Sequence, residues 1–207
     1  YYKGIRFENK DQTVSQSIID YIVNHVNKYS NILYNTNYVY SVPNETFKGK
    51  PINSDIDVAI YDKIGKKLLI IECKWKEKVY QNRENYIRIE DALKKIYDNQ
   101  LEKHQTYLEK DINRLNKLFD NQIDFTREGD VDTLYLFVDK RIQYHDNGTN
   151  RHAIPIFMLA YLFENNSSKR QLILSDVFSE IREMKSRVRY ERIKLKEPVH
   201  LGEITVI

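Results

Sequence analysis

The sequence predicts an α/β fold built as one domain, and three observations support this. Residues 11–29 place apolar side chains at helical spacing, residues 55–61 and 67–75 alternate as strands do, and residues 134–138 form a nearly continuous apolar run. A chain of 207 residues can bury a sizeable core around one sheet but is short for two full domains. We therefore expect a helix, a mixed sheet with a central hairpin, a long helix and a further strand.

Composition is that of an ordinary globular protein. Hydrophobic residues make up 41% and charged residues 30%, with 6 glycines and 4 prolines, which excludes disordered and collagen-like chains. No apolar run approaches the roughly 20 residues that span a bilayer, and no secretory signal is present, so we expect a cytoplasmic protein without a membrane partner. The single cysteine, Cys73, excludes an internal disulfide and a Cys-rich zinc site. A net charge of +3 does not identify a partner by itself.

The first expected elements are a helix over residues 11–29 and β-structure over residues 32–40. The helix carries one apolar face, and Asp11, Thr13 or Ser15 can cap its start. Residues 32–34 and 38–40 are β-prone and separated by Asn-rich residues, which indicates one bent strand or two short ones. The apolar face consists of Val14, Ile18, Ile19, Ile22, Val23 and Val26.

Residues 55–61 and 67–75 predict a hairpin whose polar turn contains Gly65. Residue numbers that face each other in an antiparallel pair have a constant sum, and a turn centred between residues 64 and 65 makes this sum 129. Asp57 then lies opposite Glu72, and Asp55 opposite Lys74. Because side chains alternate between faces, these four residues are expected to share one face. The apolar residues expected on the other face are Ile56, Val58, Ile60, Leu69, Ile71, Cys73 and Trp75.

The rest of the chain predicts a long helix, a buried strand and a tail. Residues 84–119 carry an apolar stripe without Pro or Gly, and this stripe can face a core or pair with a partner helix. His104 lies on that stripe and is interpreted as a core histidine rather than a catalytic one. After the strand at 134–138 we expect helices at 154–163 and 172–184 and strands at 188–195 and 201–207. We expect a core at 1–145 and a helical and β-hairpin extension at 146–207, packed on the same domain.

Two carboxylates and a lysine dominate the expected hairpin. Directly opposed side chains have Cβ atoms about 4.5–5.5 Å apart, so Asp57 and Glu72 can bind one cation between them, with Lys74 beside it. The alternative is the ordinary solvated face of a hairpin. Leu68 and Ile70 share the face of Glu72, however, and clustered carboxylates repel each other unless a proton or a metal offsets the repulsion.

At these residues the sequence resembles the PD-(D/E)xK superfamily, the restriction-endonuclease-like nucleases. The matching positions are Ile56-Asp57, a hairpin turn, and Glu72-Cys73-Lys74 within the run LLIIECKW. The expected order of helix, strand, hairpin, helix and strand over residues 11–139 also fits that fold. Ile56 stands where the family name has Pro.

The resemblance implies a metal-dependent nuclease that hydrolyses phosphodiester bonds of DNA, an endonuclease in restriction or anti-phage defence, with DNA repair as the second context. It implies that Asp57, Glu72 and the Cys73 main-chain carbonyl bind Mg²⁺ or Mn²⁺, with Asp55 as an extra ligand. Carboxylates are the groups by which proteins hold Mg²⁺. Lys74 would orient or deprotonate the attacking water.

The resemblance also indicates accessory residues. Many members carry a Glu on the first helix, where this chain has Gln16, and some carry a Gln on the helix after the Glu-x-Lys strand, which Gln100 or Gln105 can supply. Lys76 and Lys78 continue the face of Lys74 and either hold nucleic-acid phosphates or are simply solvated.

Two alternative functions remain open. One is a module that binds nucleic acid without cleaving it. The other is an interaction domain in which the helix at 84–119 pairs with a partner, including a second copy of the chain. Because the sequence starts with Tyr1 rather than Met, we also expect a processed product or a part of a longer protein with further domains.

Overall fold

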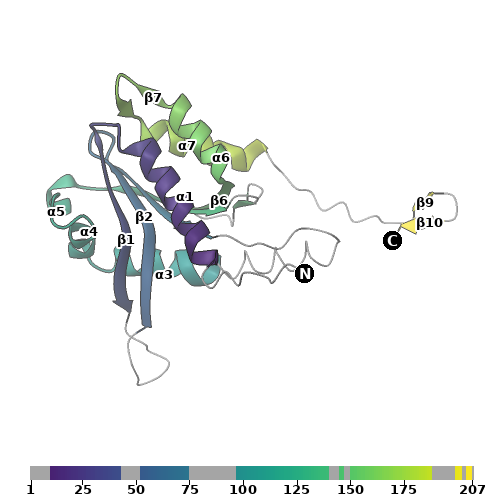
Figure 1. Ribbon diagram of the computed structural model, residues 1–207, viewed down its shortest axis with the longest axis horizontal. Helices are drawn as coiled ribbons and strands as arrows, with labels where there is room; N and C mark the ends of the chain where they lie inside the picture. The colour runs from purple at the N-terminus through teal and green to yellow at the C-terminus, as the bar shows by residue number, and fades with distance from the viewer. Residues whose placement is uncertain are drawn as a thin grey trace, which may run out of the picture.

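The computed structural model describes residues 10–42, 52–74, 97–139, 145–146, 150–187, 199–201 and 204–206. Within them, helices cover both faces of a mixed sheet, so the α/β class is confirmed (Figure 1). None of the described helices is long and apolar enough to cross a membrane.

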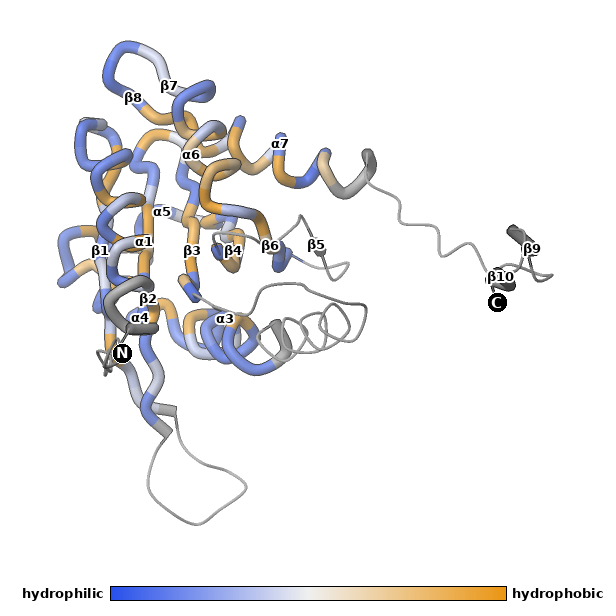
Figure 2. The backbone as a smooth tube through the Cα atoms, turned by 45° about the vertical axis from the view of Figure 1, so that its right-hand side comes forward, coloured by the Kyte–Doolittle hydropathy of each residue, from blue (hydrophilic) through white to orange (hydrophobic). Residues whose placement is uncertain are grey.

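The sheet has six described strands in the order β1-β2-β3-β4-β6-β5. Strands β1 (Ile32–Val42), β2 (Ile52–Asp62) and β3 (Lys67–Cys73) are antiparallel neighbours, as the predicted hairpin requires. Strand β4 (Asp132–Asp139) is central and runs parallel to both β3 and β6 (Arg151–Pro155). Figure 2 shows the hydrophobic stretches of β3 and β4 in the interior. The edge strand β5 (His145–Asp146) is antiparallel to β6.

One face of the sheet is covered by α1 (Lys10–Val26), α6 (Ile156–Asn165) and α7 (Leu174–Arg187). The predicted face of the first helix is confirmed, because Ile18, Ile19, Ile22 and Val26 are buried against the sheet. The sheet side of this first core consists of Val58, Ile60, Leu69, Ile71, Cys73, Leu134, Leu136, Val138 and Ile154.

The other face is covered by the π-helix η1 (Tyr97–Leu101), α3 (Glu102–Glu109), α4 (Ile112–Leu118) and α5 (Phe125–Glu128). A second core lies between these elements and the sheet. The expectation of one apolar and one reactive face is therefore wrong, because both faces of the hairpin are packed. The sheet side of the second core consists of Tyr40, Ile56, Ala59, Tyr61, Leu68, Ile70, Tyr135, Phe137 and Ala153.

The prediction of one helix over residues 84–119 is wrong in its described part. The helix breaks at Asp111, whose extended backbone and side chain cap α4 by accepting the N–H of Asn113. Asp favours this capping position because its carboxylate satisfies a main-chain N–H that the new helix leaves free. Arg114 packs over the Tyr107 ring and donates to the Tyr107 carbonyl, which holds α4 against the end of α3. Residues 84–96 lie outside the described residues.

The β-prone segment forms one bent strand, and the bend exchanges the two faces of the sheet. Asn37 has a left-handed φ of 53° and stands between the pairs Thr36–Val58 and Tyr38–Ile56, across from Asp57. Val58 packs in the first core, but Ile56 packs in the second. The prediction that Ile56 and Val58 share a face is therefore wrong. The physical reason is that a left-handed residue interrupts the regular pleat.

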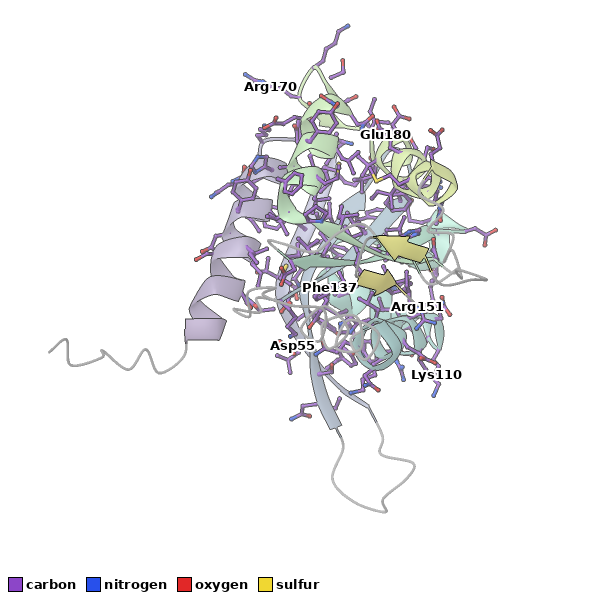
Figure 3. All side chains as sticks on the ribbon, turned by 90° about the vertical axis from the view of Figure 1, so that its right-hand side faces the viewer. Asp55, Lys110, Phe137, Arg151, Arg170 and Glu180 are labelled. Atoms are coloured by element: carbon purple, nitrogen blue, oxygen red, sulfur yellow. The ribbon has the colours of Figure 1, made fainter. Side chains whose placement is uncertain are left out.

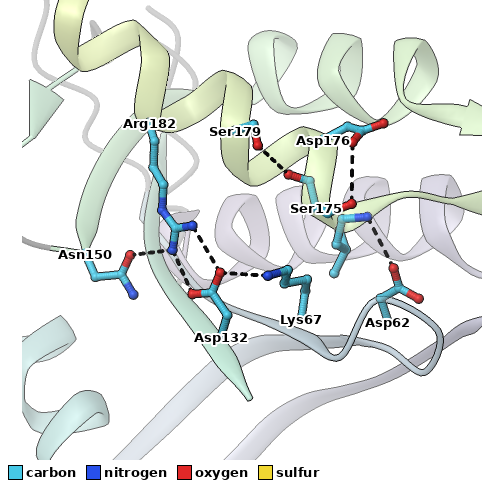
Figure 4. A network of polar contacts seen from close by, with 9 residues as sticks. Asp62, Lys67, Asp132, Asn150, Ser175, Asp176, Ser179 and Arg182 are labelled. Atoms are coloured by element: carbon cyan, nitrogen blue, oxygen red, sulfur yellow. Dashed lines mark hydrogen bonds and ion pairs between the residues drawn. The ribbon is translucent and has the colours of Figure 1, made fainter. Parts of the chain in front are cut away.

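The hairpin turn and the start of β4 are held by polar networks at the end of the sheet where β3 begins. Arg182 of α7 binds both carboxylate oxygens of Asp132, at 3.0 and 2.7 Å, and Lys67 donates to the same group (Figure 4). These contacts lower the pKa of Asp132, chiefly through the hydrogen bonds from Arg182. In the turn, a Cβ atom at Gly65 would lie 2.7 Å from Asp62 Oδ2, so any other residue would displace the Asp62 carboxylate.

The tail differs from its prediction in two places. The expected helix at 154–163 begins only at Ile156, after β6, so the sheet continues beyond residue 145. The expected helix at 172–184 is confirmed as α7, which follows the short hairpin of β7 (Ser167–Ser168) and β8 (Gln171–Leu172). Instead of one strand at 201–207, β9 (Val199–Leu201) and β10 (Ile204–Val206) pair with each other. The expected strand at 188–195 lies outside the described residues.

Candidate active site

The candidate site lies where β3 separates from β2. The predicted register is confirmed from Asp62–Lys67 to Val58–Ile71, where paired numbers have the sum 129, but the pairing ends before the predicted pair Asp57–Glu72. At the next position the Cys73 N–H donates to a carboxylate oxygen of Asp57, Oδ2, at 2.6 Å. Strand β3 nevertheless stays on β4, since the Lys74 N–H donates to the Val138 carbonyl at 3.1 Å. A side chain of β2 thus enters the opening between two strands that were paired up to this point.

Asp57 is almost fully enclosed, with 7% of its surface exposed. Burial raises the pKa of Asp57 to about 7, and the charge of Glu72 adds to the increase. The Cys73 N–H and the Lys74 ammonium act in the opposite direction but do not cancel it. The site therefore holds two carboxyl groups that disfavour being ionised together, as the hairpin geometry predicts.

Glu72 is 2% exposed and has a partner on each oxygen. Its Oε1 forms an ion pair with Lys74 Nζ at 2.6 Å, and its Oε2 lies 3.1 Å from His104 Nε2. Burial by itself lowers the pKa of Lys74, but the charge and hydrogen bond of Glu72 outweigh this and raise it above its usual value. Lys74 is therefore an ammonium ion in this arrangement.

His104 is the site neighbour that sequence reasoning assigned to the core. It is fully buried on α3, as expected for a core histidine, but its partner is Glu72. Its second nitrogen, Nδ1, lies 2.7 Å from the Tyr40 hydroxyl, and the Tyr40 ring stacks on Tyr107 at 4.0 Å. The signal available in the sequence was a polar residue on an otherwise apolar stripe, because a buried imidazole needs polar partners.

A second neighbour missed by sequence reasoning is Asp139. It ends the apolar run of β4 and is 8% exposed. The parallel register pairs Cys73 with Val138, so Asp139 stands beside Lys74 at the same end of the sheet. Its place directly after the buried strand was the signal, since side chains at the ends of neighbouring parallel strands meet at one edge.

The remaining predicted residues lie farther from this centre. Asp55, labelled in Figure 3, is exposed and pairs with Val39, and the strand pairing that would place it opposite Lys74 has already ended. Its charge still contributes to the raised pKa of Asp57. Gln16 is exposed and donates to Asp20 on its own helix at 2.9 Å, so the structure does not bring it to the site.

The two glutamines after the Glu-x-Lys strand differ from each other. Gln105 is part of an exposed pair with Glu109. Gln100 lies four residues before His104, on the same side of the helical segment, and its Oε1 is buried without a hydrogen-bond donor among the described residues. Of the two, Gln100 is the better accessory candidate. Lys76 and Lys78 lie outside the described residues.

The donor set fits a hard divalent cation. Within the part of the chain that the structure describes, no three His, Cys, Asp or Glu side chains are grouped to hold a metal ion. Mg²⁺ needs fewer, because one or two carboxylates with waters and substrate oxygens complete its coordination. Asp57, Glu72 and the Cys73 carbonyl are such a set. A cation there would offset the burial of the Asp57 charge and its repulsion by Glu72, which together raise the pKa of Asp57.

Comparison with known proteins adds no assignment to this geometry. No family model matches the chain, and no curated protein matches it. Among solved structures, protein VC1899 from Vibrio cholerae is similar over 82% of this chain, with 15% sequence identity and a TM-score of 0.33. This chain spans 33% of that protein. The fold and the site by themselves define an α/β protein with a buried acidic cluster and a lysine at the carboxyl end of β3.

Proposed function

We propose that the chain is a metal-dependent nuclease with a restriction-endonuclease-like core. One observation carries the proposal: Asp57, Glu72 and Lys74 lie together where β3 leaves β2, with the Asp57 carboxylate bonded to the main chain between the other two. Enclosing two neighbouring carboxyl groups is unfavourable for stability, because burial and, after it, the charge of Glu72 raise the pKa of Asp57 to about 7. Such clusters are more often functional than structural.

The proposed roles follow from the contacts of each group. Asp57 and Glu72 bind the cation, and the Cys73 carbonyl is the third protein ligand. Bound Mg²⁺ or Mn²⁺ would lower the pKa of a water and neutralise charge on the phosphate under attack. Asp55, exposed nearby on β2, is the candidate for an additional ligand through water.

Lys74 acts as a positive charge in this proposal. Its raised pKa and its ion pair with Glu72 favour an ammonium ion that donates hydrogen bonds over a neutral amine that accepts a proton. It would orient the attacking water and stabilise charge that develops on the phosphate oxygens. Of the two roles expected from the resemblance, the contacts favour orienting the water.

The substrate we propose is DNA, cleaved internally, in restriction or anti-phage defence. The alternative of a helix that pairs with a partner is weakened, since Leu101, Leu108 and Leu115 of its apolar stripe are buried in the second core. A module that binds nucleic acid without cutting it differs only in lacking cleavage, so an activity measurement separates the two.

The deciding experiment is incubation of the purified protein with circular and linear double-stranded DNA, single-stranded DNA and RNA, in Mg²⁺, Mn²⁺ or EDTA. We expect the circle to be cut only with metal present. Lys74→Ala should lose cleavage and keep its fold. The matched control is Lys63→Ala, an exposed lysine in the turn at the opposite end of the hairpin, which should cut normally. Binding to DNA without metal-dependent cleavage of any substrate would overturn the nuclease proposal.

A further inference from the structure

We propose that His104 is a positioning residue that holds the Glu72 carboxylate in its metal-binding orientation, with Tyr40 holding His104 in turn. The inference rests on the proposed function only in taking Glu72 as a metal ligand. It gives a residue of helix α3 a role at the site, in addition to the cluster of Asp57, Glu72 and Lys74.

Four side chains form one continuous series of polar contacts beside the second core. Tyr40 lies 2.7 Å from His104, His104 lies 3.1 Å from Glu72, and Glu72 lies 2.6 Å from Lys74. They come from β1, α3, β3 and the residue after β3. This series of contacts therefore connects helix α3 to the Glu72 carboxylate. Only Lys74, at one end of the series, is partly exposed.

The hydrogen positions in this chain follow from the partners. The Glu72 carboxylate in its ion pair can only accept, so His104 Nε2 must carry a hydrogen and donate it. In the tautomer that donates from Nε2, Nδ1 accepts from the Tyr40 hydroxyl. Burial raises the pKa of Tyr40 to about 12, so this hydroxyl keeps its proton and can donate. Tyr40 thus donates to His104, His104 donates to Glu72, and Lys74 donates to the other oxygen of Glu72.

The aromatic packing around the imidazole restricts its rotation. Tyr40 stacks on Tyr107 at 4.0 Å, and its ring meets the His104 ring edge-on at 5.8 Å. Since Tyr107 and His104 are both on α3, the same helix supports both partners of Tyr40. A ring held in this way can fix the carboxylate that it touches.

The consequence is that both carboxylates are held in place by the protein. Asp57 Oδ2 is held by the Cys73 N–H, and Glu72 Oε2 is held by His104. The second oxygen of Glu72, Oε1, is held by Lys74 at 2.6 Å, so a cation bound by Asp57 and Glu72 would share this oxygen with the ammonium group.

The test uses two amides that each replace one nitrogen of the ring. The side-chain N–H₂ of His104→Gln can reach the position of Nε2 and still donate to Glu72. His104→Asn places its amide near Nδ1, within reach of Tyr40, but leaves Glu72 Oε2 without its donor. Tyr40→Phe removes only the hydroxyl. Mn²⁺ affinity is measured by calorimetry for each full-length variant, together with cleavage rates at saturating metal and the melting temperature.

We expect His104→Asn to weaken Mn²⁺ binding by about 10- to 100-fold, which is the usual cost of losing a hydrogen-bond partner of a ligand. His104→Gln should bind Mn²⁺ within about threefold of wild type, as rescue by a retained donor requires. Tyr40→Phe should lie between them. When cleavage is also measured over a range of metal concentrations, the apparent metal constant should change more than KM for DNA.

The outcomes separate this inference from the nuclease proposal. If wild type cuts DNA with metal but His104→Asn binds Mn²⁺ normally, the positioning role is wrong and the nuclease proposal stands. Equal losses in His104→Asn and His104→Gln, following a lower melting temperature, would make His104 merely structural and also overturn it. If wild type binds Mn²⁺ but cuts no substrate, and only His104→Asn has a weaker Mn²⁺ affinity, the positioning role of His104 stands and the nuclease proposal is wrong. Absence of Mn²⁺ binding by wild type would overturn both.

Discussion

The Cys73 N–H donates to Asp57 Oδ2 at 2.6 Å, so a side chain of β2 satisfies a main-chain group of β3 where the two strands part. Asp57 therefore has a structural partner as well as a place in the candidate site. Its replacement by Ala would leave a buried N–H without an acceptor, which costs on the order of 1–3 kcal/mol in itself. Asp57→Asn keeps an acceptor oxygen and is the variant that separates the carboxylate charge from the fold.

The first prediction concerns stability against pH. The folded pKa of Asp57, about 7, lies above its ordinary value of 3.8, so the folded state binds this proton more tightly than the unfolded state. Its contribution is most favourable at low pH and is lost as pH rises towards 7. Without metal, Asp57→Asn should match wild type near pH 4 and become more stable by on the order of 2–4 kcal/mol at pH 8.

This comparison is measured by urea unfolding between pH 4 and pH 8.5 in EDTA. The same variant should have no metal-dependent cleavage at any of these pH values. A stability difference that stays constant across the range would contradict the raised pKa of Asp57.

The second prediction concerns metal and protons together. Because Asp57 holds a proton below pH 7, cation binding should displace it. Calorimetry of Mn²⁺ binding at pH 6 in buffers of different ionisation enthalpy should show release approaching one proton, falling towards zero above pH 8. The melting temperature of wild type should rise with Mn²⁺ and return with EDTA, since a ligand of the folded state stabilises it.

The matched variants for this experiment are Asp57→Asn and Glu72→Gln. Neither should be stabilised by Mn²⁺ at concentrations that stabilise wild type. If Mn²⁺ binding releases as many protons from Asp57→Asn as from wild type, the displaced proton does not come from Asp57.

The third prediction concerns Asn37, whose left-handed backbone lies across from Asp57. Asn37→Val should lower the stability by about 1–2 kcal/mol, because a β-branched residue disfavours this conformation. Cleavage should fall as well, since the bend sets the direction of β2 at Asp57. Asn37→Gly accepts the same φ and is the control, with near-normal melting temperature and cleavage. Equal behaviour of the Val and Gly variants would show that the bend does not depend on this residue.

The fourth prediction compares two glutamines. Gln16 is exposed and bonded to Asp20, so Gln16→Ala should leave cleavage within about twofold of wild type. Gln100 has a buried carbonyl oxygen on the His104 side of its helix, and Gln100→Ala should slow cleavage about tenfold while KM for DNA changes little. Rates are measured on circular DNA at saturating Mg²⁺. A larger effect at Gln16 than at Gln100 would reverse the assignment of accessory residues.

Much of the hairpin could be predicted from residue order. The turn around Gly65 determines the sum of paired numbers, and this sum holds from Asp62–Lys67 to Val58–Ile71. Alternation placed Leu68 and Ile70 on the face of Glu72, as observed. The same rule failed at Ile56, because alternation assumes a regular pleat and Asn37 interrupts it.

Local pattern could not locate the helix break or the strand β6. Residues 97–119 carry helical spacing without Pro or Gly, yet Asp111 caps a new helix whose turn is held by Arg114 on Tyr107. The short segment Arg151–Pro155 forms a strand because β4 offers it a parallel edge. In both places contacts between distant residues outweigh weak local preferences.

The sequence by itself determined the first helix, the two strands of the hairpin and their register as far as Val58–Ile71, and it singled out Asp57, Glu72 and Lys74 as candidates. These follow from interactions between near neighbours and from the strict period of a strand. Only the tertiary structure decided that His104 contacts Glu72, 32 residues away, and that Asp139 stands beside Lys74. Such contacts depend on how helices and strands pack across the chain, and short-range periodicity carries no information about that packing.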